Sequence, residues 1–112
     1  MSRDGEGAAG ADTDGGSDPD AILRELFAVI EDRKERMPED SYTASLLGHE
    51  KGTNAVLEKL GEETTELILA AKDGEEAEIA HESADVVYHL LVLLAATDVD
   101  PEALRSELRE RR

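Results

Sequence analysis

Two pairs of acidic residues in the second half of the chain interrupt apolar helical patterns. Glu63 and Glu66 are three residues apart, and Glu82 and Asp85 repeat that spacing. Residues at i and i+3 share a face of a helix, so each pair can point two carboxylates in one direction. Mg²⁺ and Mn²⁺ prefer oxygen ligands, and Mg²⁺ commonly binds through carboxylates together with substrate phosphates. The spacing therefore indicates a cation site used in phosphate chemistry.

The segment between the two pairs predicts that they lie at the same height. Asp73-Gly74 supplies a left-handed stop between two helical patterns, which predicts a short turn and an antiparallel hairpin. Facing residues in such a hairpin have position numbers with a nearly constant sum. Positions 63 and 85 have the same sum as positions 66 and 82, which is twice the position of Gly74. All four carboxylates should therefore lie roughly 12–16 Å from the turn and converge on one small volume.

Each pair places one acid in the apolar seam of its helix. The seam of residues 53–72 comprises Val56, Leu60, Glu63, Leu67 and Ala70, and that of residues 75–97 comprises Ile79, Glu82, Val86, Leu90 and Leu93. A carboxylate in an apolar seam is costly and usually becomes neutral, pairs with a cationic side chain or binds a cation. The simpler alternative is a solvated acidic face. Other acidic pairs, such as Glu75 with Glu78, have no partner in register and are typical of such a face.

Histidine offers a competing metal motif. Glu78 and His81 have the Glu-x-x-His spacing of di-iron carboxylate bundles, but those bundles need the motif twice and it occurs here once. His81 and His89 are more typical of core or rim histidines than of ligands, and the same holds for His49 in the loop before residue 53. The oxygen-only site is the favoured prediction.

A phosphate substrate also requires cationic partners. The candidates are Arg33, Lys34, Arg36, Lys51, Lys59 and Lys72. Lys59 precedes Glu63 by four residues and so lies on the same side of the helix, which makes it the best single candidate. An ordinary helical ion pair between Lys59 and Glu63 remains an equal alternative.

The elements that carry these residues are all predicted to be helices, since no segment alternates apolar and polar residues as a strand would. The first helix should begin near Asp18-Pro19, end around Arg36 and bury a stripe that comprises Ile22, Leu23, Leu26, Phe27 and Ile30. A connecting loop should contain at most one helical turn across residues 43–47. Helices over residues 53–72, with Thr53 as a possible cap, and 75–97 should form the hairpin, and a short helix should follow Asp100-Pro101.

Composition limits the class of protein. The first 20 residues contain five glycines and six acids and little that is apolar, which predicts a disordered acidic tail at 1–18 ahead of one domain at 19–112. The tail lacks the features of a signal or transit peptide, and no uninterrupted apolar stretch approaches a membrane span, so we expect a soluble cytoplasmic protein without membrane contact.

The charge and the absence of cysteine narrow the chemistry further. Without cysteine there are no disulfides, thiolate nucleophiles or cysteine-bound metals. The net charge of −16 at pH 7 disfavours a basic surface for nucleic acid. Such an excess of acids suits a high-salt cytoplasm, where salt screens self-repulsion, although an ordinary acidic protein has a similar composition.

The helix at 75–97 is apolar around most of its circumference. It carries Val86, Val87, Leu90, Leu91, Leu93 and Leu94. A helix of this kind must be covered on several sides, and one small domain offers few partners. We therefore expect a bundle completed by homodimerisation, with a central helix in a monomeric bundle as the alternative.

The blocks "EKLGEETTELILAAKDG" at 58–74 and "HESADVVYHLLVLLA" at 81–95 resemble the phosphoribosyl-ATP pyrophosphatase family of the MazG-like all-α pyrophosphohydrolases. The loop "SYTASLL" at 41–47 and "KG" at 51–52 are also similar, and the resemblance covers about residues 20–108. It implies a MazG-like helical bundle, a dimer or higher oligomer, and Mg²⁺-dependent hydrolysis of phosphoribosyl-ATP to phosphoribosyl-AMP and pyrophosphate. That reaction is the second step of histidine biosynthesis.

The resemblance also implies roles for individual residues. The family motifs E-E-x-x-E and E-x-x-D match Glu62, Glu63, Glu66, Glu82 and Asp85. It implies that Glu63, Glu66, Glu82 and Asp85 hold Mg²⁺ and that Glu62 or Glu66 orients or deprotonates the attacking water. The residues expected to contact the substrate are Lys59, Lys72, Lys51 and the loop residues Ser41, Tyr42 and Thr43. The long tail and the "GHE" at 48–50 depart from the family pattern.

Two other functions remain open on the sequence. A MazG-like house-cleaning pyrophosphatase acting on ordinary or damaged nucleoside triphosphates would share the carboxylates and differ in its base and sugar pocket. A non-catalytic acidic helical module would dimerise or bind a basic partner. The module predicts that Glu63 and Glu82 are not buried, so burial of these two side chains discriminates it from either enzyme.

Overall fold

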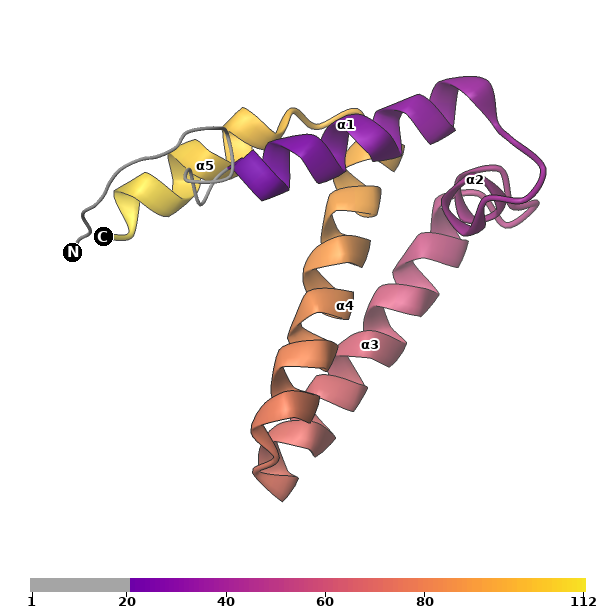
Figure 1. Cartoon of the computed structure of the whole chain (residues 1–112). Helices are drawn as coiled ribbons and strands as arrows, with labels where there is room; N and C mark the ends of the chain where they lie inside the picture. The colour runs from indigo at the N-terminus through magenta and orange to yellow at the C-terminus, as the bar shows by residue number, and fades with distance from the viewer. Residues whose placement is uncertain (1–20) are drawn as a thin grey trace, which may run out of the picture.

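The computed structural model describes residues 21–112, which form helices and no strands (Figure 1). The helices are α1 (Ala21–Arg36), α2 (Tyr42–Leu47), α3 (Thr53–Asp73), α4 (Glu76–Ala96) and α5 (Pro101–Glu110). The predicted all-α class is confirmed for these residues. The expected acidic tail at 1–18 and the expected helix start at Asp18-Pro19 lie outside them.

The hairpin of α3 and α4 is the principal feature of the fold (Figure 1). Gly74 ends α3 in the left-handed conformation, with φ 79°, and its N–H donates to the carbonyl of Ala70 at 3.1 Å. This confirms the predicted stop, because glycine adopts positive φ without steric cost. The prediction of Thr53 as the cap of α3 is wrong by one residue. Gly52 occupies the cap with φ 64°, and Thr53 is the first helical residue.

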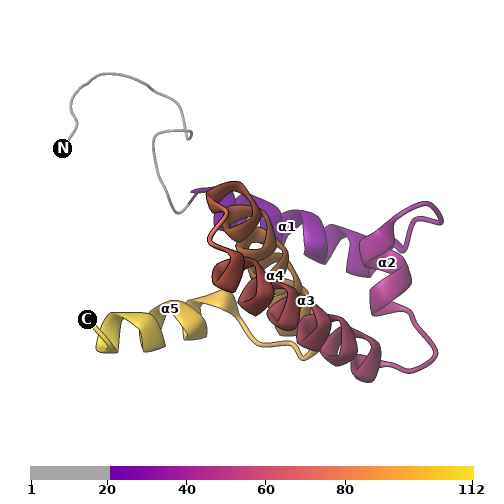
Figure 2. The same cartoon turned by 90° about the horizontal axis from the view of Figure 1, so that it is seen from below.

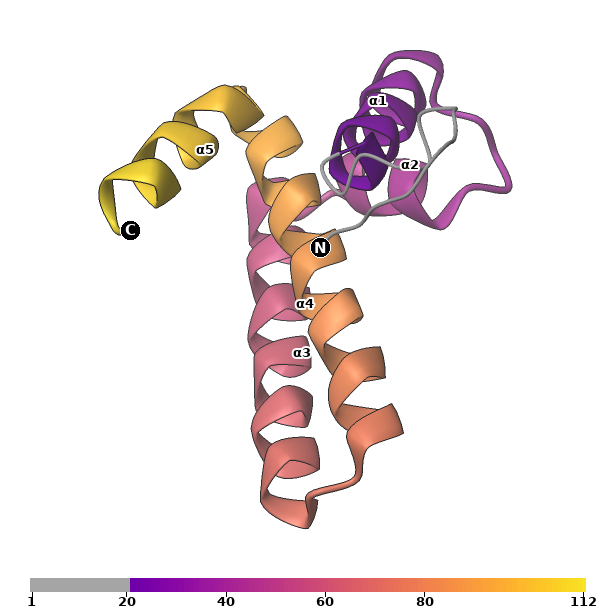
Figure 3. The ribbon, with the colours of Figure 1, turned by 60° about the vertical axis from the view of Figure 1, so that its left-hand side comes forward.

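The shorter elements close one end of the hairpin. Helix α1 packs against α4 and α2, and α2 packs in turn against α3 and α4, at the end opposite the Gly74 turn (Figures 1 and 2). Helix α2 begins one residue earlier than the predicted turn, at Tyr42. Helix α5 extends away from the hairpin (Figure 3). Asp100 caps α5 by accepting from the N–H of Glu102 at 2.8 Å, and Pro101 follows in the first turn, as predicted.

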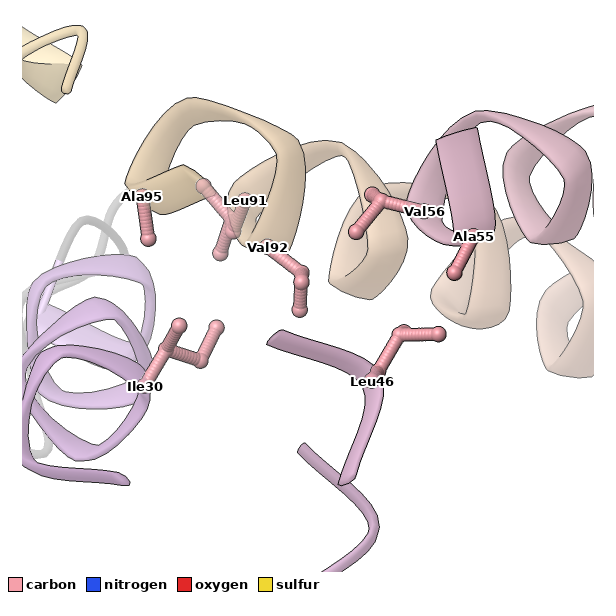
Figure 4. Close-up of a cluster of buried hydrophobic side chains, with 7 residues drawn as sticks. All are labelled: Ile30, Leu46, Ala55, Val56, Leu91, Val92 and Ala95. Carbon is pink, nitrogen blue, oxygen red and sulfur yellow. The ribbon is translucent and has the colours of Figure 1, made fainter. Parts of the chain in front are cut away.

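The hydrophobic core lies where the first four helices meet (Figure 4). It is formed by Ile30, Leu46, Ala55, Val56, Leu91, Val92 and Ala95. Ile30, Val56 and Val92 are its largest fully buried side chains, one each from α1, α3 and α4. Because these helices are fixed against each other here, the register of the hairpin beyond the core is fixed as well.

The predicted apolar stripe of α1 is only partly buried. Ile30 is fully buried and Leu26 and Phe27 pack against the core, but Ile22 is 62% exposed and Leu23 is 42% exposed. The prediction that Ile22 and Leu23 are core residues is wrong for the described chain. Periodicity identifies the apolar face of a helix, whereas burial depends on how much of that face another helix covers.

Helix α4 is strongly apolar, but the other helices of the same chain bury only part of its surface. By length and composition alone, the helix Glu76–Ala96 could cross a membrane, but the core helix of a soluble bundle can have the same length and composition. In this chain 22% of its apolar 18-residue stretch is buried. Val87 on α4 is 40% exposed, and Ile68 and Leu69 on α3 are 55% and 53% exposed. Exposed apolar side chains therefore lie on both helices of the hairpin.

Candidate active site

The acidic residues of α3 and α4 face one another in the middle of the hairpin. The Glu63 side chain is only 13% exposed, and the Glu82 Oε1 atom is buried without a hydrogen-bond partner among the described residues. Burial raises the pKa of Glu82, and repulsion from Asp85, Glu63 and Glu66 raises it further. Three carboxylates, two of them from the opposite helix, thus act on one buried oxygen. Glu66 itself is exposed and Asp85 is partly exposed.

The chemistry of this arrangement fits a bound cation. A buried carboxylate oxygen with no donor and several acidic neighbours is unfavourable, and a divalent ion with oxygen ligands would relieve both the lost hydration and the repulsion. The residues present therefore fit Mg²⁺ or Mn²⁺. The partial burial of Glu63 and of the Glu82 Oε1 atom is also contrary to what a solvated acidic face or a non-catalytic module predicts.

His81 lies closer to the carboxylates than the sequence suggested. One ligand atom from each of His81, Glu82 and Asp85 falls within 4.8 Å of the others. The His81 Nε2 atom is 3.6 Å from Asp85 Oδ2, and its charged form would lower the pKa of Glu82. The ring is 66% exposed at the rim of the cluster. Glu78, the partner in the competing Glu-x-x-His motif, is exposed and is not part of this group.

Lys59 places a positive charge beside the cluster. Its Nζ atom is 3.6 Å from Glu63 Oε2 and 3.5 Å from Glu62 Oε1. Glu62 is 66% exposed, so it lies on the solvent side of Lys59 and Glu63 on the buried side. The pKa of Lys59 is raised, first by the neighbouring Tyr42 and then by Glu62. Lys59 therefore forms the helical ion pairs that the simpler alternative predicts. It is also the lysine closest to the acidic cluster among the three predicted to bind substrate.

The other two predicted lysines lie further from the cluster. Lys51 is exposed and its Nζ atom pairs with Glu58 Oε1 at 3.1 Å. Lys72 is exposed in the last turn of α3, nine residues beyond Glu63, which corresponds to about 13 Å along the helix axis. The structure therefore brings Lys59 to the acidic cluster and leaves Lys51 and Lys72 toward the two ends of α3.

Two of the three predicted loop hydroxyls serve to hold α2 in place. The Ser41 hydroxyl caps α2 by accepting from the N–H of Ala44 at 3.1 Å. Thr43 is buried, and its hydroxyl bonds the Tyr88 hydroxyl on α4. Ser41 therefore stabilises the start of α2, and Thr43 contributes to the docking of α2 on α4.

Tyr42 is the loop residue that faces the acidic cluster. Its side chain is 49% exposed, while its hydroxyl is hydrogen-bonded to His89 Nε2 at 2.8 Å. Partial burial raises the pKa of Tyr42, Lys59 lowers it, and the negative charges of Glu63 and Asp85 raise it again. The phenol thus lies within electrostatic reach of both the cation and the carboxylates.

His89 is the residue whose role the sequence reasoning missed. It is only 4% exposed, as expected of a core histidine, but both ring nitrogens are engaged. Its Nδ1 atom is 2.7 Å from the carbonyl oxygen of Asp85, one helical turn earlier, and its Nε2 atom faces Tyr42. The spacing of four between Asp85 and His89 could have suggested the first contact. The second joins residues 47 positions apart and depends on how α2 docks.

Comparisons with known proteins agree with this geometry. The profile of the family described as "Phosphoribosyl-ATP pyrophosphohydrolase" matches residues 23–112. A protein of Haloarcula marismortui named phosphoribosyl-ATP pyrophosphatase is 71% identical over 91 residues, which cover 81% of this chain and 93% of the relative.

Two further relatives carry the same name. One from Halobacterium salinarum is 69% identical over 97 residues, covering 86% of this chain and 99% of the relative. One from Geobacter metallireducens is 49% identical over 92 residues, covering 82% of this chain and 83% of the relative. The match thus spans the α3 and α4 hairpin with its acidic cluster and nearly the full length of the halophile relatives. This chain therefore belongs to the phosphoribosyl-ATP pyrophosphohydrolase family, within the MazG-like all-α superfamily.

Proposed function

We propose that this chain hydrolyses phosphoribosyl-ATP to phosphoribosyl-AMP and pyrophosphate, the second step of histidine biosynthesis, and that it requires Mg²⁺. Membership of the family and the names of the relatives support the reaction. The observation that supports a metal-dependent site is the buried Glu82 Oε1 atom, which lacks a partner among the described residues and is surrounded by other carboxylates.

The residues that would hold Mg²⁺ are Glu63 and Glu66 on α3 with Glu82 and Asp85 on α4. When bound, the ion would neutralise phosphate charge and favour departure of pyrophosphate. The two helices fix the opposing pairs at one height, and the core at the end of the hairpin fixes their register. These side chains are therefore held in place before the substrate arrives, which lowers the cost of assembling the site.

The chemical step needs a carboxylate that accepts a proton from water. Attack by water forms a new bond between oxygen and phosphorus, the bridging bond between the α and β phosphates breaks, and pyrophosphate leaves. One proton of the water passes to the base. Glu62 and Glu66 are the candidates, since both are exposed beside the buried Glu63 and can reach solvent.

Substrate contacts are proposed for the residues around the cluster. Lys59 would pair with phosphate oxygens, because it lies beside Glu63 and its pKa is raised, so it is charged at neutral pH. Lys51 and Lys72 would contribute positive charge toward the two ends of α3. Among Ser41, Tyr42 and Thr43, we assign direct contact to Tyr42, because the other two hydroxyls are engaged in holding α2.

We also propose that the chain is a homodimer. The exposed apolar side chains of Ile68, Leu69 and Val87 come from both helices of the hairpin, and a second copy would cover them. Sedimentation at molar KCl should give twice the mass of one chain, and Leu69→Glu should shift the population toward monomer. A monomeric wild type under those conditions would refute this proposal.

The remaining proposals concern the environment. We propose a cytoplasmic enzyme adapted to high salt, with a small nucleotide as its partner and no nucleic-acid or membrane ligand. The net charge of −16 and the halophilic sources of the most similar relatives described above support this. Activity should rise with KCl concentration up to the molar range, because screening weakens repulsion among the acids.

The test is pyrophosphate release in molar KCl with Mg²⁺. Phosphoribosyl-ATP is compared with dUTP and dCTP, using the wild type, Glu63→Gln, Glu82→Gln and, as the matched control, the exposed Glu78→Gln. We expect preference for phosphoribosyl-ATP, losses of about a hundredfold or more in the first two variants, and near wild-type activity in the control. Cleavage of dUTP or dCTP alone would replace the substrate assignment, and no hydrolysis of any of them would overturn the proposed enzyme.

A further inference from the structure

The buried ring of His89 connects the acidic hairpin to α2. Its Nδ1 atom lies 2.7 Å from the carbonyl oxygen of Asp85 and its Nε2 atom 2.8 Å from the Tyr42 hydroxyl. The ring packs edge to face against Tyr42, with centroids 5.8 Å apart, and against Tyr88, with centroids 5.3 Å apart. At 4% exposure it has no room to rotate into solvent, so both contacts are maintained together.

The hydrogen-bonding capacities of these groups determine the direction of the bond to Asp85 and, for a neutral ring, that of the bond to Tyr42. A carbonyl oxygen only accepts, so Nδ1 of His89 must carry the proton and donate to Asp85. In the neutral ring Nε2 is then an acceptor, and the Tyr42 O–H donates to it. The carbonyl oxygen of Asp85 thereby favours the tautomer of His89 with its proton on Nδ1. In that tautomer Nε2 is free to accept from the Tyr42 hydroxyl, which fixes the direction in which the O–H points.

The consequence for α2 is a defined position at the edge of the acidic cluster. Two adjacent residues of α4, Tyr88 and His89, bind two adjacent residues of α2, Thr43 and Tyr42. The Thr43 contact is buried, whereas Tyr42 keeps 49% of its side chain exposed. Through the His89 ring the Tyr42 hydroxyl is joined to the backbone of Asp85, and the charges of Lys59, Glu63 and Asp85 act on it, so Tyr42 is held on the side of α4 that carries the proposed metal ligand Asp85.

We propose that His89 is a positioning residue, which holds Tyr42 against the acidic cluster so that the tyrosine binds the nucleotide substrate. This rests on the proposed function, because it requires the substrate phosphates to lie at the carboxylates. His89 itself does not contact substrate, since its ring is buried and both nitrogens are occupied. Its loss should therefore weaken substrate binding more than it slows the chemical step.

The side-chain amides of asparagine and glutamine separate the two bonds of the ring. His89→Asn retains a donor at the position of Nδ1 and loses the acceptor for Tyr42, whereas His89→Gln places an acceptor at the position of Nε2. We expect His89→Asn to raise the KM about two- to tenfold with kcat little changed, and His89→Gln to recover part of that loss. The control is His49→Asn, the same substitution at an exposed histidine.

Tyr42→Phe makes the test independent of any folding defect in the His89 variants. It removes only the hydroxyl of a half-exposed side chain and should raise the KM as much as His89→Asn. The double variant should be no worse than either single variant, because both remove the same bond. Additive losses, or an unchanged KM in His89→Asn with active wild type, would overturn the positioning role alone.

Nitrogen chemical shifts of the histidine rings provide a readout besides activity. The proposal requires His89 to be the neutral tautomer with its proton on Nδ1, which is the less common form of free neutral histidine. Finding the Nε2-protonated form would overturn the geometry from which the proposal starts. A wild type that shows the expected tautomer but hydrolyses no nucleotide would instead overturn the proposed function, and the role of His89 with it, so the two failures are distinguishable.

Discussion

Replacing Glu82 by glutamine should change the stability of this protein in opposite directions with and without Mg²⁺. In EDTA the wild type keeps a buried Glu82 oxygen that has no hydrogen-bond partner in the described part of the chain and is repelled by Asp85, Glu63 and Glu66. Glutamine removes the charge and retains the shape of the side chain, so Glu82→Gln should melt at a higher temperature than the wild type in EDTA. Because Mg²⁺ would bind the charged carboxylates, the same substitution should abolish most of the stabilisation by the ion.

The size of the Mg²⁺ effect follows from linkage. Above the dissociation constant, each tenfold increase in Mg²⁺ concentration adds about 1.4 kcal/mol to the free energy of unfolding per bound ion. For a domain of the size of residues 21–112, this corresponds to a rise of roughly 6–11 °C in Tm. A slope twice as large would indicate two ions per chain. The slope for Glu82→Gln should be several times smaller, so the two melting curves cross as Mg²⁺ increases.

The assay is thermal unfolding in molar KCl, followed by helical circular dichroism over a series of Mg²⁺ concentrations. Additional KCl at matched ionic strength controls for screening, and Glu78→Gln controls for the loss of one acid from α4. Stabilisation of the wild type by KCl equal to that by Mg²⁺ would refute the metal site. So would parallel melting curves for the wild type and Glu82→Gln, because the buried oxygen would then take no part in binding.

Three further results are expected. In EDTA the difference in stability between Glu82→Gln and the wild type should close as pH falls from 7 toward the ordinary glutamate pKa, and thermal melts across that range will test this. The reason is that the pKa of Glu82 is raised in the folded state. A group of this kind contributes stability that is present below its unfolded-state pKa and is lost as pH rises through its folded-state pKa. Gly61→Ala should stabilise the protein by about 0.5–1 kcal/mol, because Gly61 lies in the middle of α3 and an added Cβ has no neighbour within 4 Å. Gly74→Ala should destabilise it by about 1 kcal/mol, because the backbone there has φ 79°. Urea unfolding of both variants will show whether the two changes have opposite signs. Lys34→Met should lower Tm by about 4–8 °C in thermal melts. The Lys34 ammonium donates to a carbonyl at the end of α4 and to the Asp98 carboxylate, each at 2.7 Å, and this partly exposed contact contributes about 1 kcal/mol. An unchanged Tm would show that the contact contributes nothing.

The local features of the helices were predictable from spacing. Gly74 ends α3 and Asp100 caps α5 as expected, because turns and caps depend on residues adjacent in the chain. The seam positions of Glu63 and Glu82 were also predictable, since helical periodicity places both among apolar neighbours. The Gly52 cap was missed because Thr53 has the side chain typical of a cap, whereas the backbone at Gly52 requires a positive φ.

Burial could be predicted only where a neighbouring helix covers the apolar face. Ile22 and Ile30 are on the same predicted stripe of α1, yet one is 62% exposed and the other fully buried. The difference depends on which part of α1 contacts other helices, and periodicity carries no information about that.

By itself, the sequence determined the helical class, the hairpin and the placement of one acidic pair on each of its helices, because these depend on short-range spacing and a turn at Gly74. Only the tertiary structure decided that the Glu82 oxygen is buried without a partner among residues 21–112 and that His89 contacts Tyr42. The contact between His89 and Tyr42 depends on the docking of α2 on the hairpin. Docking is governed by side-chain packing between segments distant in the chain, which local spacing does not encode.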